Sequence, residues 1–176
     1  MKQALILQGW YQKPEDNWYP WLKKELENKG YKVFLPDLPT IHTDLIDMEK
    51  QLEYLDKLIT LDEESLVVGH SIGSVLALRL AEKYKIGKMI LLAGWDFNDL
   101  TKEHRLFWPN PIDHAKIIAN VGEIYCFSSD NDPYFTAFTV EDMSKRLKGK
   151  FVLVKGAGHF TGDKGVTKIP ELLELI

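Results

Sequence analysis

A serine between two glycines is the first group in this sequence whose spacing suggests a chemistry. The run Gly69-His70-Ser71-Ile72-Gly73 has the pattern G-x-S-x-G and lies between a short apolar segment and a longer apolar stretch with helical spacing. Between a strand and a helix, this pattern holds the serine on a strained turn with its hydroxyl above a sheet edge. The spacing predicts that Ser71 is a nucleophile. The alternative is a Ser/Gly turn that only caps the helix.

A serine hydroxyl is not ionised near neutral pH, so it needs a base, and the base needs a carboxylate to orient it. His159 lies in a glycine-rich run after one apolar segment, and Asp132 lies in a polar run after another. The chain order Ser71, Asp132, His159 is typical of α/β-hydrolases rather than of the other serine-triad folds. We predict these three as catalytic residues. Asp130 competes as the acid, and we interpret it as a solvated turn residue.

Acyl transfer also needs two backbone N–H groups to stabilise the tetrahedral oxyanion. The amide of Ile72, directly after the serine, is one predicted donor. The other should come from the loop after the first apolar segment, Gln8–Tyr11, where Trp10 is the predicted donor. The triple glycine that lipases carry in this loop is absent from the sequence.

Four other histidines receive structural interpretations, as loop, surface or turn residues, although His104 or His114 could instead line a pocket. They are His42, His70, His104 and His114. No pair of histidines has metal-ligand spacing, and the calcium-loop-like segment Asp130–Glu141 has phenylalanine where the sharp turn needs glycine. We therefore predict no metal and no cofactor. Cys126, inside an apolar segment, is predicted to be a small buried hydrophobe.

Short apolar segments alternate with segments of helical spacing along the whole chain. The predicted strands are 4–7, 32–35, 65–68, 88–92, 123–127 and 150–154. The predicted helices start at Asp16 or Asn17, at Thr43 or Asp44, at Ile72, near Ala115, at Thr139 and at Pro170. Residues 95–112 are predicted to form a long irregular connection.

This alternation predicts an α/β protein, a three-layer α/β/α sandwich with about six mostly parallel strands. Ligands bind beyond the carboxyl ends of the strands in such sheets. Ser71, Asp132 and His159 each follow a predicted strand. They should therefore meet at one edge of the sheet.

Composition is consistent with one domain spanning residues 1–176. The formal net charge is −4, which argues against nucleic acid as a partner, since phosphate binding needs a basic face. A single cysteine rules out an intrachain disulfide. The first apolar run is too short for a secretory signal, and no run approaches the roughly 20 residues of a membrane span. We expect a cytoplasmic protein that does not interact with membranes.

Five blocks of sequence carry a family resemblance. They are Leu7–Trp10, Asn17–Lys24, Gly69–Ser74, Ser128–Pro133 and Gly158–Phe160. With them, the chain resembles the small serine hydrolases of the YdeN and retinoblastoma-binding protein nine family. The resemblance implies a minimal α/β-hydrolase fold with no large lid, and it maps nucleophile, acid and base onto Ser71, Asp132 and His159. Asn131 departs from the pattern, because relatives often have a second aspartate there.

The leading hypothesis is a carboxylesterase-like serine hydrolase that cleaves small acyl esters through an acyl-enzyme on Ser71. Aromatic residues near the predicted strand ends are candidates for the substrate pocket. They are Trp10, Tyr11, Trp95, Phe97, Phe107 and Trp108. Thioester or amide hydrolysis would use the same machinery. A further alternative is a hydrolase-fold protein whose main role is protein–protein interaction, suggested by the exposed-looking aromatic run Leu106–Pro111.

Overall fold

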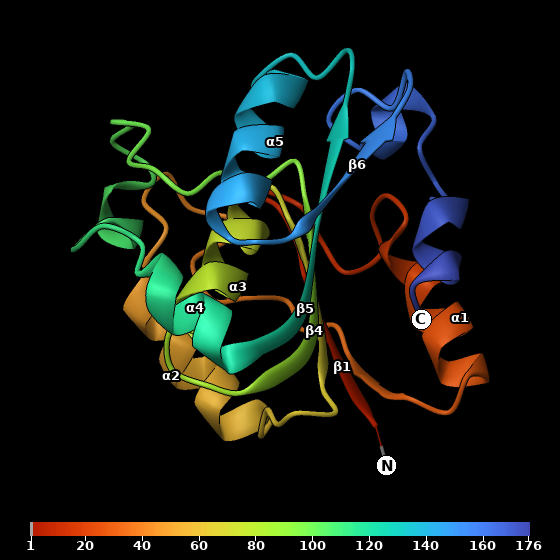
Figure 1. The fold of residues 1–176 in the computed structure, drawn as a ribbon, viewed down its shortest axis with the longest axis horizontal. Helices are drawn as coiled ribbons and strands as arrows, with labels where there is room; N and C mark the ends of the chain where they lie inside the picture. The colour runs from red at the N-terminus through yellow and green to blue at the C-terminus, as the bar shows by residue number, and fades with distance from the viewer. Residues whose placement is uncertain (1) are drawn as a thin grey trace.

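The computed structural model describes residues 2–176, which form a six-stranded sheet (Figure 1). The strands are β1 (Gln3–Leu7), β2 (Lys32–Phe34), β3 (Leu66–His70), β4 (Ile86–Leu92), β5 (Val121–Ser129) and β6 (Lys150–Val154). Their order across the sheet is β2-β1-β3-β4-β5-β6, and every neighbouring pair is parallel. The α/β class and the parallel sheet predicted from the sequence are confirmed.

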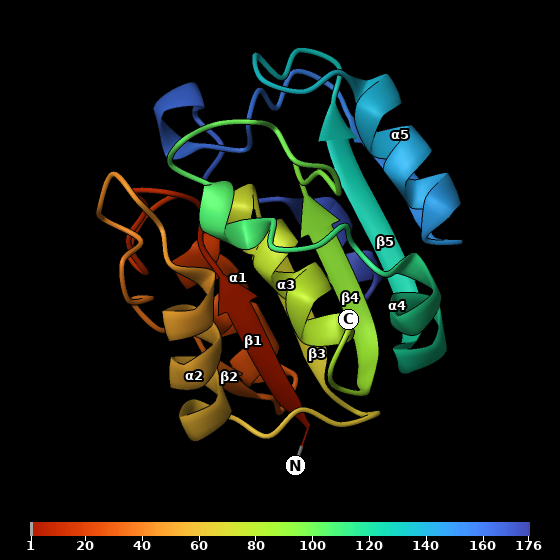
Figure 2. The ribbon, with the colours of Figure 1, turned by 90° about the vertical axis from the view of Figure 1, so that its left-hand side faces the viewer.

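Helices cover both faces of this sheet. They are α1 (Tyr19–Asn28), α2 (Met48–Leu58), α3 (Ile72–Ala81), α4 (His114–Asn120) and α5 (Ala137–Arg146), with the short 3₁₀ helices η1 (Arg105–Phe107), η2 (Gly162–Lys164) and η3 (Pro170–Glu174). Helices α2 to α5 lie in front of the sheet in Figure 2, and α1 with the C-terminal segment lies on the other side in Figure 1. The arrangement is the three-layer sandwich.

Strand β1 is apolar at successive positions because both of its faces are buried. Leu5 and Leu7 pack in the core cluster on the α2–α5 side, whereas Ala4 and Ile6 pack in the cluster on the α1 side. All four side chains are fully buried. A strand covered on both faces needs apolar residues on both faces, so the usual alternation with polar residues disappears.

The predicted start of α1 is wrong, because both expected capping side chains make other contacts. The helix begins at Tyr19, and its N-cap, Trp18, makes no side-chain capping bond. The carboxylate of Asp16 accepts from the backbone N–H of Lys13 (2.7 Å). The amide of Asn17 donates to the side chain of Gln12 (2.7 Å).

The predicted start of α2 is also wrong. Asp47 caps this helix by accepting from the N–H of Lys50 (3.2 Å). The hydroxyl of Thr43 donates instead to the carbonyls of Thr40 (2.7 Å) and Leu45 (2.9 Å). Thr43 therefore stabilises a loop that precedes the helix.

The predicted cap of α5 is displaced by one turn. Thr136 is the N-cap, and its side chain accepts from the N–H of Thr139 (3.3 Å). Thr139 is thus the third helical residue rather than the cap. The cap therefore lies three residues before the predicted start.

The connection over residues 95–112 packs onto the core. Phe107 is fully buried, and Trp95 is buried as well. The guanidinium of Arg79, on α3, donates to the carbonyls of Phe107 (2.8 Å) and Asn110 (2.6 Å). The interpretation of Leu106–Pro111 as an exposed aromatic patch is therefore wrong for Phe107.

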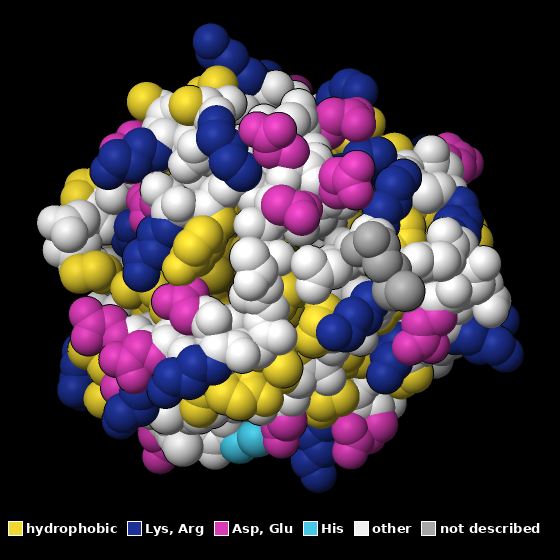
Figure 3. Space-filling view, turned by 90° about the horizontal axis from the view of Figure 1, so that it is seen from below, with side chains coloured by type: hydrophobic (Ala, Val, Ile, Leu, Met, Phe, Trp, Pro, Cys, Tyr) yellow, Lys and Arg dark blue, Asp and Glu magenta, His cyan; other side chains and the backbone are white. Residues whose placement is uncertain are grey.

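Acidic and basic side chains are interspersed on the face at the amino ends of the strands (Figure 3). This face shows no broad patch of one charge. Within residues 2–176, none of the helices combines the length and apolarity needed to cross a membrane.

Candidate active site

The turn after β3 holds Ser71 in a strained backbone conformation, with φ 56° and ψ −123°. A Cβ at Gly69 would lie 2.5 Å from the carbonyl oxygen of Gly73, and a Cβ at Gly73 would lie 2.4 Å from that of Leu7. Neither contact is sterically possible, so the turn needs glycine on both sides of the serine. The N–H of Ser71 donates to the carbonyl of Leu92 (2.9 Å), which ties the turn to the end of β4.

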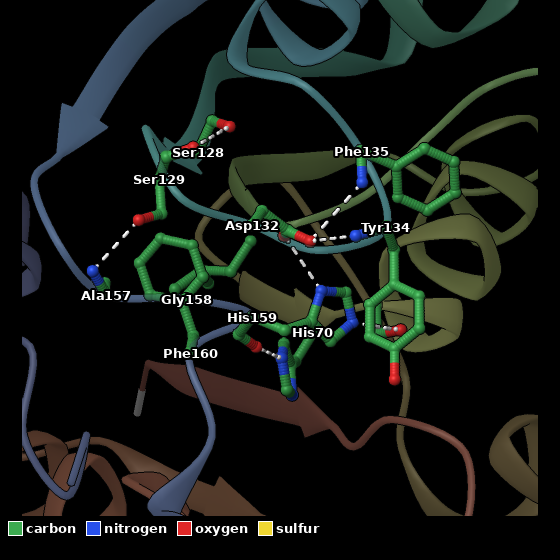
Figure 4. A network of polar contacts seen from close by, with 12 residues as sticks. His70, Ser128, Ser129, Asp132, Tyr134, Phe135, Ala157, Gly158, His159 and Phe160 are labelled. Carbon is green, nitrogen blue, oxygen red and sulfur yellow. Dashed lines mark hydrogen bonds and ion pairs between the residues drawn. The ribbon is translucent and has the colours of Figure 1, made fainter. Parts of the chain in front are cut away.

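The structure brings Ser71, Asp132 and His159 together from the ends of three parallel strands. The Nε2 atom of His159 lies 2.9 Å from Ser71 Oγ, and its Nδ1 atom lies 2.8 Å from Asp132 Oδ2 (Figure 4). An imidazole that donates from Nδ1 to a carboxylate presents the lone pair of Nε2 to the hydroxyl. This arrangement can remove a proton from Ser71 as its oxygen attacks an acyl carbon.

The carboxylate of Asp132 is almost completely buried, with 1% of the side chain exposed. Its Oδ1 atom accepts from the backbone N–H groups of Tyr134 (2.8 Å) and Phe135 (3.3 Å). The Asp132 side chain therefore fixes the following loop with one oxygen and the imidazole of His159 with the other.

Asp130 does not contact His159. Side chains at the end of β5 bind three consecutive N–H groups of the loop that carries His159. The pairs are Gly156 N–H to Asp130 Oδ1 (2.7 Å), Ala157 N–H to Ser129 Oγ (2.9 Å) and Gly158 N–H to Asn131 Oδ1 (2.7 Å). The glycine-rich loop is thus pinned, and Asp130 is more than a solvated turn residue. The only signal in the sequence was the run of short polar side chains before Asp132.

The predicted oxyanion donors lie beside the serine. Gly9 approaches Ser71 closely, since a Cβ added to Gly9 would lie 3.3 Å from the serine Cβ. Among the described residues, no protein acceptor binds the backbone N–H of the next residue, Trp10, or that of Ile72. The indole of Trp10 donates to the carbonyl of Thr43 (2.9 Å), which anchors the loop. The N–H groups of Ile72 and Trp10 therefore remain the predicted oxyanion donors.

Several predicted pocket residues belong to a series of aromatic contacts around the site. The ring pairs, with centroid separations, are Trp10–Tyr11 (5.1 Å), Trp10–His104 (5.5 Å), Trp95–His104 (5.6 Å), Trp95–Phe135 (4.7 Å), Phe97–Phe135 (6.2 Å) and Tyr134–His159 (4.7 Å). The ring of Tyr134 lies against the imidazole of His159 in Figure 4. His104 could line a pocket, but an exposed position was favoured for it, whereas its side chain is only 13% exposed. Tyr134 and Phe135 were not among the predicted pocket residues, although they directly follow Asp132 and Pro133.

Phe107 and Trp108 make their contacts elsewhere. The carbonyl of Phe107 accepts from Arg79, and the ring of Trp108 lies 5.7 Å from the guanidinium carbon of Arg79. Arg79 is eight residues beyond Ser71, a distance of about 12 Å along a helix. These two residues were predicted to line the pocket, but the structure does not bring them to the aromatic series.

Cys126 is fully buried in β5, and burial raises the pKa of its thiol to about 12. A thiol held neutral in this way behaves as a small hydrophobe. In the part of the chain that the structure describes, no group of three or more His, Cys, Asp or Glu side chains is arranged to hold a metal ion.

Known proteins match this chain in sequence and in fold. The chain is 27% identical to the serine hydrolase RBBP9 of Rattus norvegicus, over 90% of this chain and 84% of that protein. It is also 27% identical to YdeN of Bacillus subtilis, over 99% of this chain and 94% of YdeN. The crystal structure of the ydeN gene product superposes with a TM-score of 0.88 and 26% identity, covering 99% of this chain and 96% of that one.

A more distant neighbour has the same fold. Est1E from Butyrivibrio proteoclasticus superposes with a TM-score of 0.70 at 16% identity, covering 98% of this chain and 87% of that one. The model of the family described as serine hydrolase matches residues 4–176, which is nearly the whole chain. The chain therefore belongs to the serine hydrolase family.

Proposed function

We propose that this chain is an esterase-like enzyme that cleaves small acyl esters through an acyl-enzyme on Ser71. One observation carries the proposal. The imidazole of His159 lies 2.9 Å from Ser71 Oγ on one side and 2.8 Å from Asp132 Oδ2 on the other. A serine on a strained turn, a base in contact with it and a carboxylate that orients the base are the parts that nucleophilic acyl transfer needs.

In the proposed reaction, Ser71 Oγ attacks the acyl carbon and its proton moves to His159 Nε2. Asp132 stabilises the imidazolium that forms, and the N–H groups of Ile72 and Trp10 stabilise the oxyanion. The tetrahedral intermediate then breaks its C–O bond to the leaving group, which takes the proton from His159 and departs as an alcohol. Water repeats the sequence on the acyl-enzyme and releases the acid, with Ser71 restored.

The surroundings of the site favour short acyl groups. Residues 95–112, the long connection beside the site, are anchored to the core through Trp95 and Phe107 and contain only the three-residue helix η1, which argues against a large lid. Tyr134 is largely exposed, and Tyr11 and Phe97 are nearly half exposed. These aromatic side chains offer apolar contact area for a small substrate without enclosing a long chain.

The same machinery would hydrolyse thioesters or amides, and relative rates on matched substrates decide among the three. A main role in protein binding has less support, because the aromatic run that suggested it buries Phe107 against α3.

We also infer that residues 1–176 act as one domain in the cytoplasm, on a small-molecule substrate. A sheet covered on both faces supports the single domain.

Hydrolysis of p-nitrophenyl acetate tests the proposal. We expect Ser71→Ala and His159→Ala to lower kcat/KM by about 10⁴-fold while the far-UV circular dichroism is unchanged. His42→Ala is the matched control, because His42 also pairs with a carboxylate, Asp37, at 2.8 Å. The control should keep activity within about threefold. Wild-type turnover by folded Ser71→Ala would refute the assignment.

A further inference from the structure

Two fully buried polar side chains lie behind the candidate site and have no role in the proposed chemistry. Tyr19 begins α1, and His70 ends β3 directly before Ser71. The Tyr19 hydroxyl lies 2.6 Å from His70 Nδ1, and it also accepts from the backbone N–H of Gly9 (3.2 Å). On the other side of the ring, His70 Nε2 lies 2.7 Å from the carbonyl oxygen of His159 (Figure 4).

The donor and acceptor groups of these residues fix the direction of each hydrogen bond between them. A carbonyl oxygen only accepts, so His70 Nε2 donates a proton to the carbonyl of His159. Burial lowers the pKa of His70 to about 3, and the ring is therefore neutral with a lone pair on Nδ1. Burial also raises the pKa of Tyr19, which keeps its proton and donates it to that lone pair. Gly9 N–H then donates to the phenol oxygen.

This series of hydrogen bonds joins the three segments whose relative positions the proposed reaction depends on. Gly9 precedes the proposed oxyanion donor Trp10, His70 precedes Ser71, and the accepting carbonyl belongs to His159 itself. We propose that Tyr19 and His70 are positioning residues, which hold the oxyanion loop and the base-bearing loop at fixed places around the serine. This inference rests on the proposed hydrolase function.

The hydrogen bonds do more than fill the core. The ring of His70 also packs against the rings of Trp18 (5.8 Å) and His159 (5.3 Å), so a hydrophobic side chain would fill the same space. A polar pair in a dry place is costly unless each group is satisfied, and here each group has a partner. The partners are the main chain of the two loops, so losing one bond releases a loop rather than only a side chain.

Tyr19→Phe tests the proposal, because it removes one oxygen atom and keeps the ring. We expect kcat on p-nitrophenyl acetate to fall at least about tenfold with KM changed less than about twofold, since small displacements of reacting groups cost rate more than binding. Tyr125→Phe is the matched control. Tyr125, at the middle of β5, is also buried, and its hydroxyl also makes two hydrogen bonds, with Glu123 (2.7 Å) and Lys150 (3.1 Å).

The control should lose a similar amount of thermal stability and keep both kinetic constants. A Tyr19→Phe enzyme that is folded and keeps kcat within about twofold, or changes only KM, would overturn the proposal. Comparison of His70→Gln with His70→Leu supplies a second test that does not depend on Tyr19. The glutamine amide can still donate to the carbonyl of His159, so it should recover a large part of the kcat that leucine loses. Equal kcat values for the two variants would also overturn the proposal.

The wild-type enzyme separates this inference from the proposed function. Ester turnover that depends on Ser71, together with an unaffected Tyr19→Phe enzyme, rejects only the positioning role. Absence of turnover in the folded wild-type chain rejects the proposed esterase function, and the positioning role falls with it.

Discussion

Gly73 shows how much of the site depends on a missing side chain. Its Cα lies so close to the main chain of β1 that a Cβ would meet the carbonyl oxygens of both Leu7 (2.4 Å) and Gln8 (2.7 Å). The first turn of α3 can approach the sheet this closely only with glycine at this position. That approach places Ser71 beside the loop that follows β1.

We predict that Gly73→Ala lowers the free energy of unfolding by about 1–3 kcal/mol and lowers kcat at least about tenfold, because the helix start must move away from β1. Urea unfolding and ester turnover measure the two effects. Gly30→Ala is the control. Its φ of +85° also strains alanine, but nothing lies within 4 Å of the added Cβ and the position is at the far end of α1. A Gly73→Ala enzyme with wild-type kcat contradicts this account of the turn.

The two carboxylates after β5 should differ in function. Asp132→Asn breaks the charged contact with His159 Nδ1, and we predict a loss in kcat of about 10²–10⁴-fold. Asp130→Asn keeps an oxygen that accepts from the N–H of Gly156, so kcat should stay within about threefold. Steady-state kinetics of both variants measure this difference. A larger loss from Asp130→Asn would show that the acid has been assigned to the wrong residue.

At the scale of elements, a half-buried ion pair joins the segment after β4 to two helices. The Asp96 carboxylate, 1% exposed, accepts from Arg146 of α5 (Nε 2.8 Å, Nη2 2.7 Å) and from His114 Nε2 of α4 (2.7 Å). Burial alone would raise the pKa of Asp96, but the hydrogen bonds from Arg146 and His114 outweigh it and hold the pKa below its usual value. These bonds from Asp96 hold α4 and α5 against the segment that follows β4.

Because the pKa of Asp96 is lowered in the folded protein, its ion pair makes the stability of the protein depend on pH. An aspartate with a depressed folded-state pKa stabilises the protein above its unfolded pKa of about 3.9, and this stability is lost as pH falls through the folded pKa. We predict that Asp96→Asn lowers the free energy of unfolding by about 3 kcal/mol at pH 7 and by clearly less at pH 3. Urea titrations at both pH values measure the difference. An equal loss at both pH values contradicts the proposed charge on Asp96.

Element boundaries were harder to predict from the sequence than the elements themselves. The strands and most helices were evident, because apolar runs and helical spacing are properties of neighbouring residues. Several side chains near a helix start can cap it, and the choice depends on contacts outside the helix. Asp47 caps α2 rather than Thr43, because the hydroxyl of Thr43 binds two loop carbonyls. Asn17 binds Gln12 and the backbone N–H of Gly162, which is distant in the sequence.

For the whole molecule, the parallel sheet determines where the chemistry can occur. Ser71, Asp132 and His159 are far apart in the sequence, but each follows a strand of one parallel sheet, so one edge gathers them. This meeting could be predicted, because it needs only the strands and their direction. The aromatic surroundings could be predicted only in part, because they depend on how long connections pack. Tyr134 reaches His159, whereas Phe107 turns into the core.

Because residues 95–112 form no large lid over the site, we predict that the enzyme prefers substrates with short acyl chains. We expect kcat/KM on p-nitrophenyl esters to be highest for acyl chains of about two to four carbons and to fall with longer chains, since little enclosed apolar surface is available to bind them. A chain-length series measures this preference. A maximum at long chains would contradict a shallow site.

The central claim is that Ser71 is an activated nucleophile, and a fluorophosphonate probe tests it most directly. The probe forms a covalent bond with a serine oxygen only where a base activates it. We predict one adduct per chain, located on Ser71 by peptide mass spectrometry and absent from Ser71→Ala and from heat-denatured protein. Ser74 is an internal control, because its buried hydroxyl donates to two backbone carbonyls. A folded wild-type protein with no adduct, or with its adduct on another serine, would contradict the account.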